Sequence, residues 1–170
     1  VEALDLDNAA GPFNMEIFTG DPGDNNCNFF FGGAMDVLQP YIDEGKLVVQ
    51  SGQVTKEEVS TADWSTEKAQ ARMDAILASN YADKNLDVVL CSNDSTALGV
   101  ENSLAANYNG EWPIITGQDC DKPNVKNLVA GKQSMSVFKD TRKLAEQTVK
   151  MVDAIMSGET AETNDNETYD

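Results

Sequence analysis

Four hydrophobic runs along the chain each end in a short polar tip, after which the sequence takes on a helical pattern. The runs and their tips lie at 15–20 into 24–26, 88–91 into 93–94, 114–117 into 118–119, and 135–138 into 139–140. In an open parallel sheet the carboxyl ends of the strands lie along one edge, and such folds bind ligands in the crevice there. The pattern therefore predicts that these tips converge on one binding site.

Amphipathic helical patterns separate the predicted strands. Apolar residues recur with helical spacing over 30–42 and stop at Gly45, and Pro40 should kink this helix or weaken its last turn. A β-prone stretch at 47–49 adds a further strand. Later helices are expected from Ser65, with Ala69, Met73, Ile76 and Leu77 buried, and over 95–107, 123–130 and 141–156, with a last strand at 134–138. The alternation predicts an α/β fold: a doubly wound, mainly parallel five-stranded sheet with helices on both faces.

Two segments fall outside this alternation. The connection 51–64 is long, polar and ends in Trp64, and long loops in compact domains are usually functional or disordered. The tail from Glu159 is acidic and poor in apolar residues. It cannot offset the entropy of ordering by itself, so we expect it to be mobile or docked elsewhere.

Composition narrows the class of protein. The 170 residues are 41% hydrophobic, which suits one domain with a sizeable core. Twelve Lys and Arg against 29 Asp and Glu give a net charge of −17, which would repel nucleic acid. The cysteines Cys27, Cys91 and Cys120 are odd in number and lack C-x-x-C spacing, so neither a disulfide framework nor a zinc site is indicated. No apolar stretch has membrane-spanning length, and a removed signal or a lipid anchor stays open.

The polar tips carry groups suited to sugar hydroxyls. Asn donates and accepts hydrogen bonds, a carboxylate accepts two donors, and an aromatic face covers the C–H surface of a sugar ring. The five candidates for substrate binding are Asn26, Trp64, Asn93, Asp119 and Lys139. The chain has no His, and no nucleophile has a neighbouring base in the pattern, so we expect no catalytic residue, cofactor or metal.

Each tip residue also has a purely structural interpretation. Asn93 is equally well placed to be a helix N-cap, and both roles hold together if Asp94 or Ser95 provides the cap. Similarly, one of residues 24–26 should cap the first helix, with Asn26 preferred as the ligand contact.

The other candidates are equally open at this stage. Asp119 could be a solvated loop carboxylate, since Asp is common at strand ends. Lys139 could be a surface residue paired with Asp140, because most lysines are exposed. Trp64 could cover the edge of the core, although its place after a polar loop favours a ligand platform.

Five segments in order resemble the xylose- and multiple-monosaccharide-binding proteins of bacterial ABC importers. They are Gly20 to Asn26, Val37 to Lys46, Ser92-Asn93-Asp94, Thr116 to Asp119, and Val137 to Lys139. The similarity extends from about Gly11 to the end of the chain, and its motifs are long and ordered.

The resemblance implies a solute-binding component that holds a monosaccharide of the xylose, glucose, galactose and arabinose class between two α/β lobes and releases it to a membrane permease. It implies that Trp64 stacks on the sugar ring and that Asn26, Asn93, Asp119 and Lys139 bind its hydroxyls. It also implies secretion, to the periplasm or to the outer surface of a one-membrane bacterium as a lipid-anchored protein.

The resemblance further implies that this sequence corresponds to one lobe and lacks the N-terminal one. We expect 1–139 to be the C-terminal sugar-binding lobe, 140–157 a helix that would pack on the missing N-terminal lobe, and 158–170 an acidic mobile tail. The chain would then carry only part of the site. Its last helix is expected to fold back, swap into another molecule or be poorly ordered.

Three other functions compete. A receiver-type signalling domain shares a five-stranded doubly wound fold, but it needs paired acidic residues directly after its first strand, where this chain has Gly-Asp-Pro-Gly-Asp-Asn-Asn. A sugar-acting enzyme could use Asp24, Asp94 and Asp119 as acid, base or metal ligands. A sugar-responsive transcription regulator would need a helix-turn-helix and a basic surface, which a charge of −17 does not suggest.

Overall fold

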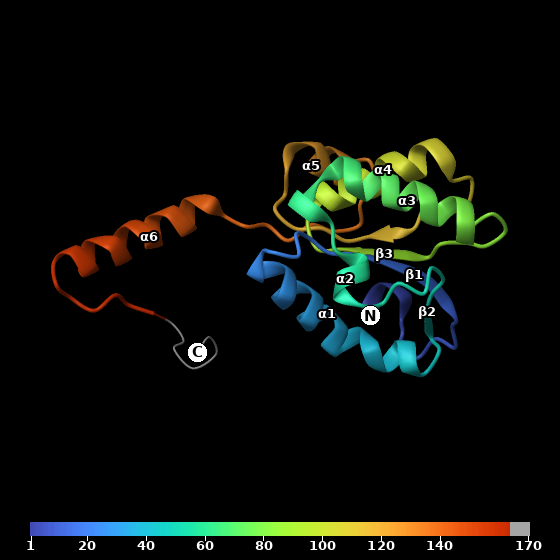
Figure 1. Ribbon diagram of the computed structural model, residues 1–170, viewed down its shortest axis with the longest axis horizontal. Helices are drawn as coiled ribbons and strands as arrows, with labels where there is room; N and C mark the ends of the chain where they lie inside the picture. Colours follow the sequence, from blue (N-terminus) through green and yellow to red (C-terminus); the bar gives the residue numbers. More distant parts are fainter. Residues whose placement is uncertain (164–170) are drawn as a thin grey trace. The chain divides into compact units, whose positions relative to one another are not determined.

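A four-stranded parallel sheet organises the first of two units, Val1–Phe138, and a second unit begins at Lys139. The computed structural model describes residues 1–163 (Figure 1). The strands are β1 Phe13–Phe18, β2 Leu47–Val49, β3 Val88–Cys91 and β4 Ile114–Ile115, in the order β2-β1-β3-β4. Each pair of neighbours runs parallel. The predicted α/β class and parallel sheet are confirmed.

The predicted fifth strand is reduced to a single bridge, so the expected count of five strands was wrong by one. The segment 134–138 follows β4, with the Ser134 N–H 2.9 Å from the Ile115 oxygen and a parallel bridge between Gln118 and Val137. The ladder stops there because the next residue, Asp119, has a φ of 106°. Extended pairing cannot continue through a residue in that conformation.

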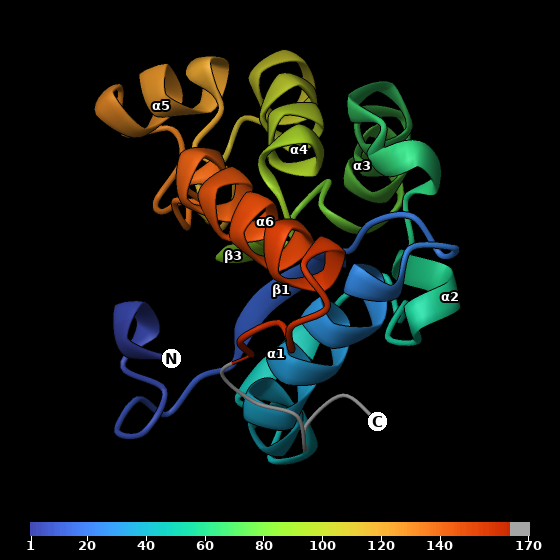
Figure 2. The same ribbon diagram turned by 90° about the vertical axis from the view of Figure 1, so that its left-hand side faces the viewer.

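Helices cover both faces of the sheet, as Figures 1 and 2 show: α1 lies on one face, and α3 and α4 lie on the other. The bounds within this unit are η1 Glu2–Leu4, α1 Asn25–Asp43, α2 Lys56–Val59, η2 Ala62–Trp64, α3 Thr66–Asn80, α4 Asp94–Asn107 and α5 Lys122–Val129. Side chains along β1 point alternately to the two faces of the sheet, so they belong to two separate core clusters. Met15 and Ile17 pack in the cluster beneath α1, whereas Phe18 packs with residues of α3 and α4.

Local sequence signals account for most helix ends. Ser65 accepts a hydrogen bond from the Lys68 N–H and caps α3, whose predicted four buried residues are all buried. Helix α1 is capped by Asp24 and continues through Pro40 to Asp43, so the proline does not end it. Gly45 then supplies the expected stop with a φ of 74°.

The connection 51–64 is not a plain loop, contrary to expectation. It contains α2 and η2. Thr55 and Glu58 form a capping box, in which each side chain binds the backbone N–H of the other residue. The sequence Thr55-x-x-Glu58 is the usual signature of such a box, so this short helix was predictable from a local signal.

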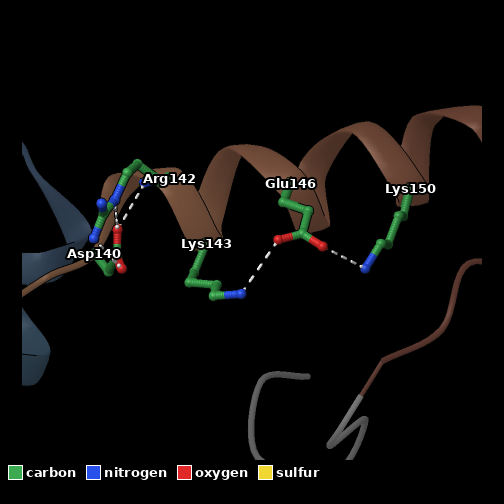
Figure 3. Close-up of polar contacts among 5 residues, drawn as sticks. All are labelled: Asp140, Arg142, Lys143, Glu146 and Lys150. Carbon is green, nitrogen blue, oxygen red and sulfur yellow. Dashed lines mark hydrogen bonds and ion pairs between the residues drawn. The ribbon is translucent and has the colours of Figure 1, made fainter.

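The described part of the second unit, 139–163, contains one helix, α6 Thr141–Met156, at the predicted bounds. The Asp140 carboxylate caps it through the Arg142 N–H, and Glu146 pairs with Lys143 and Lys150 along its exposed surface (Figure 3). No residue of α6 is buried, and Leu144, Val152 and Ile155 are all more than half exposed. The packing of this helix on another lobe stays a prediction, and residues 164–170 of the expected mobile tail lie outside the described part.

Within residues 1–163, no helix combines the length and apolar character needed to cross a bilayer.

The contact between α3 and α4 depends on Gly99. A Cβ at this position would lie 2.2 Å from the Thr66 carbonyl oxygen and 2.8 Å from the Ala69 Cβ. We predict that Gly99→Ala lowers the free energy of unfolding by about 2 kcal/mol, through overpacking of this contact. Gly33→Ala is the matched control, because nothing lies within 4 Å of a Cβ there, and it should raise stability by about 0.5 kcal/mol. Urea denaturation measures both, and equal effects would refute the packing argument.

A buried carboxyl on α4 makes stability depend on pH. Glu101 is 3% exposed, and Asn127 donates a hydrogen bond to its Oε2, whereas Oε1 has no partner among the described residues. Burial raises the pKa of Glu101 from 4.5 to about 7. Between these values the unfolded chain is ionised while the native state keeps its proton. Stability should therefore fall as pH rises through this window.

We predict that Glu101→Gln removes this pH-dependent cost. The variant should be more stable than the parent at about pH 8 and close to it at about pH 4, because glutamine resembles the protonated acid. Glu57→Gln, an exposed change on α2, is the control. Thermal unfolding across this pH range checks the prediction, and a constant offset between variant and parent would contradict it.

Candidate functional site

The tips of β1, β3 and β4 are joined by hydrogen bonds at one edge of the sheet. The Ser92 N–H donates to the Phe18 oxygen at 3.0 Å, and the Ser92 hydroxyl lies 3.1 Å from that of Thr19. One strand further along, the Asp94 N–H donates to the Gln118 oxygen at 2.9 Å. These three tips therefore converge as predicted, and hydrogen bonds join them along one edge of the sheet, called here the bonded edge.

Trp64 lies against the tip of β1. A Cβ on Gly20 would come within 2.1 Å of three indole carbon atoms, so the ring packs directly on the Gly20 backbone. The Phe30 ring contacts it in a T-shaped arrangement, with centroids 6.2 Å apart. Trp64 is half-buried. The long connection thus brings an aromatic surface to the same edge as the polar tips.

Asn26 occupies the first turn of α1. The cap of this helix is Asp24, whose Oδ1 accepts the Asn26 N–H at 2.9 Å. Asn26 is exposed. The competition for the cap is settled in favour of Asp24, and the Asn26 side chain is not needed for that purpose.

Asn93 itself caps α4, so neither Asp94 nor Ser95 takes that role. Its Oδ1 accepts hydrogen bonds from the Thr96 N–H at 3.0 Å and from the Thr96 hydroxyl at 2.9 Å. The residue is 8% exposed. Its carbonyl oxygen is committed to the helix, and its side-chain N–H groups are the part suited to a ligand oxygen.

Asp119 lies in a strained loop beyond β4. Its φ is 106°, and that of Cys120 is 55°. The Asp119 N–H donates to the Val137 oxygen at 2.9 Å. Among the described residues, Trp64 with a φ of 52° is another non-glycine residue in a left-handed conformation. Such strain is concentrated at functional sites, where the surrounding structure maintains it.

Lys139 is exposed and opens the second unit. Both oxygens of the adjacent Asp140 bind the Arg142 guanidinium, at 2.9 and 3.0 Å (Figure 3). The Asp140 carboxylate is thus engaged by Arg142.

Sequence reasoning missed the central role of Asp94. This fully buried carboxylate accepts hydrogen bonds from the Gln133 amide at 2.9 Å, the Ser136 hydroxyl at 2.8 Å and the Asp121 N–H at 2.8 Å. A Cβ on Gly117 would lie 2.3 Å from it, so glycine is required there. No local signal identifies this role, because the partners lie 27 to 42 residues away in sequence.

The polar groups at this edge are amides, hydroxyls and carboxylates. Residues 1–163 contain no group of three or more Cys, Asp or Glu side chains placed to hold a metal ion. Such an edge offers hydrogen bonds and an aromatic face to a neutral polar molecule.

Comparisons with known proteins agree with this chemistry. Residues 3–160 match the model of a family described as periplasmic binding protein domain. The whole chain is 50% identical to the multiple sugar-binding periplasmic protein SbpA of Azospirillum brasilense and 49% identical to the multiple sugar-binding periplasmic receptor ChvE of Rhizobium radiobacter. It covers 48% and 49% of these proteins. The chain thus spans about half the length of the curated relatives it matches.

Solved structures extend the similarity to the fold. An ABC transporter solute binding protein from Clostridium phytofermentans, with bound beta-D-glucose, is 70% identical with a TM-score of 0.98, over 99% of this chain and 52% of that one. A carbohydrate transporter solute binding protein from Chloroflexus aurantiacus, in complex with D-glucose, is 31% identical with a TM-score of 0.82, over 96% and 53%. The comparisons give no support to a receiver domain or a sugar-acting enzyme.

The bonds to Asp94 lead to a stability prediction. Asp94→Ala removes the acceptor of the buried Gln133 amide, the Ser136 hydroxyl and the Asp121 N–H, and it should lower the free energy of unfolding by about 3 kcal/mol. Asp83→Ala, an exposed change, should stay within about 0.5 kcal/mol of the parent. Urea denaturation of both variants provides the comparison, and a small loss for Asp94→Ala would show that the carboxylate does not hold the tips together.

Proposed function

We propose that this chain, which belongs to the periplasmic binding protein domain family, binds a monosaccharide non-covalently at the carboxyl ends of its strands. It would supply one side of the sugar site in the solute-binding component of a bacterial ABC importer. The observation that carries this proposal is the bonded edge where polar tips meet an aromatic ring, in a chain 70% identical to a protein with bound glucose.

The residue roles follow from the groups that each side chain presents. Trp64 offers an indole face to the C–H surface of the sugar, as aromatic rings do for apolar patches. Asn26 and Asn93 offer amide N–H groups, and the Asp119 carboxylate accepts two hydroxyl donors. Lys139 contributes an ammonium donor. The strained backbone of Trp64 and Asp119 supports a functional role for these two positions.

The partners and location follow from the same proposal. The ligand is a monosaccharide of the xylose, glucose, galactose or arabinose class, and the bound sugar is delivered to a membrane permease. The named relatives are periplasmic, which supports a place outside the cytoplasmic membrane, in a periplasm or on a lipid anchor. A transport role needs no chemical step, so the protein would release the sugar unchanged.

The division into parts is also proposed. The segment 1–139 acts as the C-terminal sugar-binding lobe, and 140–157 forms a helix that packs on an N-terminal lobe. The exposed apolar face of α6 supports a packing role for this helix. An acidic tail covers 158–170. In a two-lobe protein the sugar contacts both lobes, and this chain would provide the contacts of one lobe.

Sugar titration tests the proposed function. The 170-residue chain should bind D-glucose or D-xylose saturably. Its affinity should be much lower than that of a two-lobe relative, because a single lobe leaves part of the sugar exposed to water. Asp119→Ala should weaken this binding about tenfold, through loss of an ionic hydrogen-bond acceptor. Asp83→Ala is the matched control and should bind as the parent does. Absence of saturable binding, or equal binding by Asp119→Ala, would refute the proposal.

A further inference from the structure

Trp64 lies in a backbone conformation that something else must maintain. Asp63 has a φ of 62° and Trp64 a φ of 52°, so two successive non-glycine residues are left-handed. This conformation costs free energy for residues that carry a Cβ. The indole therefore keeps its place only while contacts around it offset the strain.

Asp21 fixes the backbone just before the tryptophan. Its Oδ2 accepts the Asp63 N–H at 2.6 Å, and its Oδ1 accepts the Gly23 N–H at 2.7 Å. These two hydrogen bonds lower the pKa of Asp21 from its ordinary value. The loop that carries Trp64 is thus joined to the tip of β1.

Asp24 fixes the indole ring itself. Its Oδ2 accepts the Trp64 Nε1–H at 3.1 Å, while its Oδ1 accepts the Asn26 N–H at 2.9 Å. One carboxylate therefore joins the ring to the first turn of α1. Two of the proposed sugar contacts, Trp64 and Asn26, are held in a fixed relation by this group.

Packing defines which indole face is left for a ligand. One face lies on the Gly20 backbone, where a Cβ would overlap three ring atoms. The Phe30 ring approaches at an interplanar angle of 70°, so it does not stack in parallel on the indole. A sugar ring would stack on the face opposite Gly20. Rotation of the indole out of this orientation would remove that surface.

We propose that Asp24 is a positioning residue that holds Trp64 in the orientation in which it stacks on sugar, an inference that rests on the proposed function. Asp24 acts through Trp64 and does not contact the sugar. Its loss should weaken sugar binding about tenfold, because a hydrogen bond to a charged acceptor contributes on that scale.

Three substitutions separate this role from helix capping. Asp24→Ser keeps an N-cap acceptor for α1 but is too short to reach the indole N–H. Asp24→Asn keeps the single oxygen that the N-cap needs but places an amide N–H opposite the indole N–H, so it also loses the bond to Trp64. Asp36→Ser changes an exposed residue of the same helix and is the matched control. All three are made in the full chain with Trp112→Phe, which leaves Trp64 as the single tryptophan.

Fluorescence reports on the environment of the Trp64 indole in the absence of sugar. Asp24→Ser should shift Trp64 emission to the red and increase its quenching by acrylamide, while circular dichroism keeps the helical signal of the parent. Asp24→Asn should change in the same direction as Asp24→Ser, and Asp36→Ser should match the parent in all three measurements. Unchanged emission and quenching in Asp24→Ser would overturn the proposal.

Titration with D-glucose by NMR reads the consequence for binding. Asp24→Ser and Asp24→Asn should each bind about tenfold more weakly than the parent, and Asp36→Ser should bind equally well. In a Trp64→Phe background, which lacks the indole N–H, Asp24→Ser should cause no further loss. Parent-like glucose affinity in Asp24→Ser, or a full further loss in the Trp64→Phe background, would overturn the positioning role.

The two proposals fail in different ways. A parent chain that binds no glucose contradicts the proposed function and removes the sugar role of Asp24 with it. A parent chain that binds glucose, together with an Asp24→Ser variant of equal affinity, contradicts the positioning role alone.

Discussion

The buried carboxylate of Asp94 is the interaction on which the ligand edge depends. A fully buried carboxylate is tolerated only when its lone pairs are filled, and here Gln133, Ser136 and Asp121 fill them. These donors come from segments that no regular ladder holds, because β4 has only two residues. The carboxylate joins these segments to the first residue of α4. Rigid support of this kind is what a binding site on loops requires.

The fold was predictable where its signals are local. The cap at Ser65 and the buried spacing that follows it set α3, and the stop at Gly45 set the end of α1. The fifth strand could not be predicted correctly, because pairing at 134–138 depends on the conformation of Asp119, which lies on another segment. Hydrophobic runs indicate where strands can form, whereas the length of a ladder is set by its partner.

The sequence predicted where the site lies better than it predicted which side-chain contacts form it. Three of the four predicted polar tips join at one edge, those that follow β1, β3 and β4. The use of Asn93 as a helix cap and the hydrogen bond from Trp64 to Asp24 depend on side-chain geometry that sequence spacing does not specify. Asp24 and Asp94 were visible as tip residues, yet their importance comes from partners distant in sequence.

The proposed sugar site lies along one edge of the sheet, at the tips of β1, β3 and β4. NMR chemical-shift mapping of the described residues during titration with D-glucose tests it most directly. We expect the largest shifts at Asn26, Trp64, Asn93 and Asp119. A cavity of about 690 Å³ lies around Tyr81 and Asn109, near the C-terminal ends of α3 and α4. Shifts concentrated at that cavity, or no saturable shifts at all, would contradict the account.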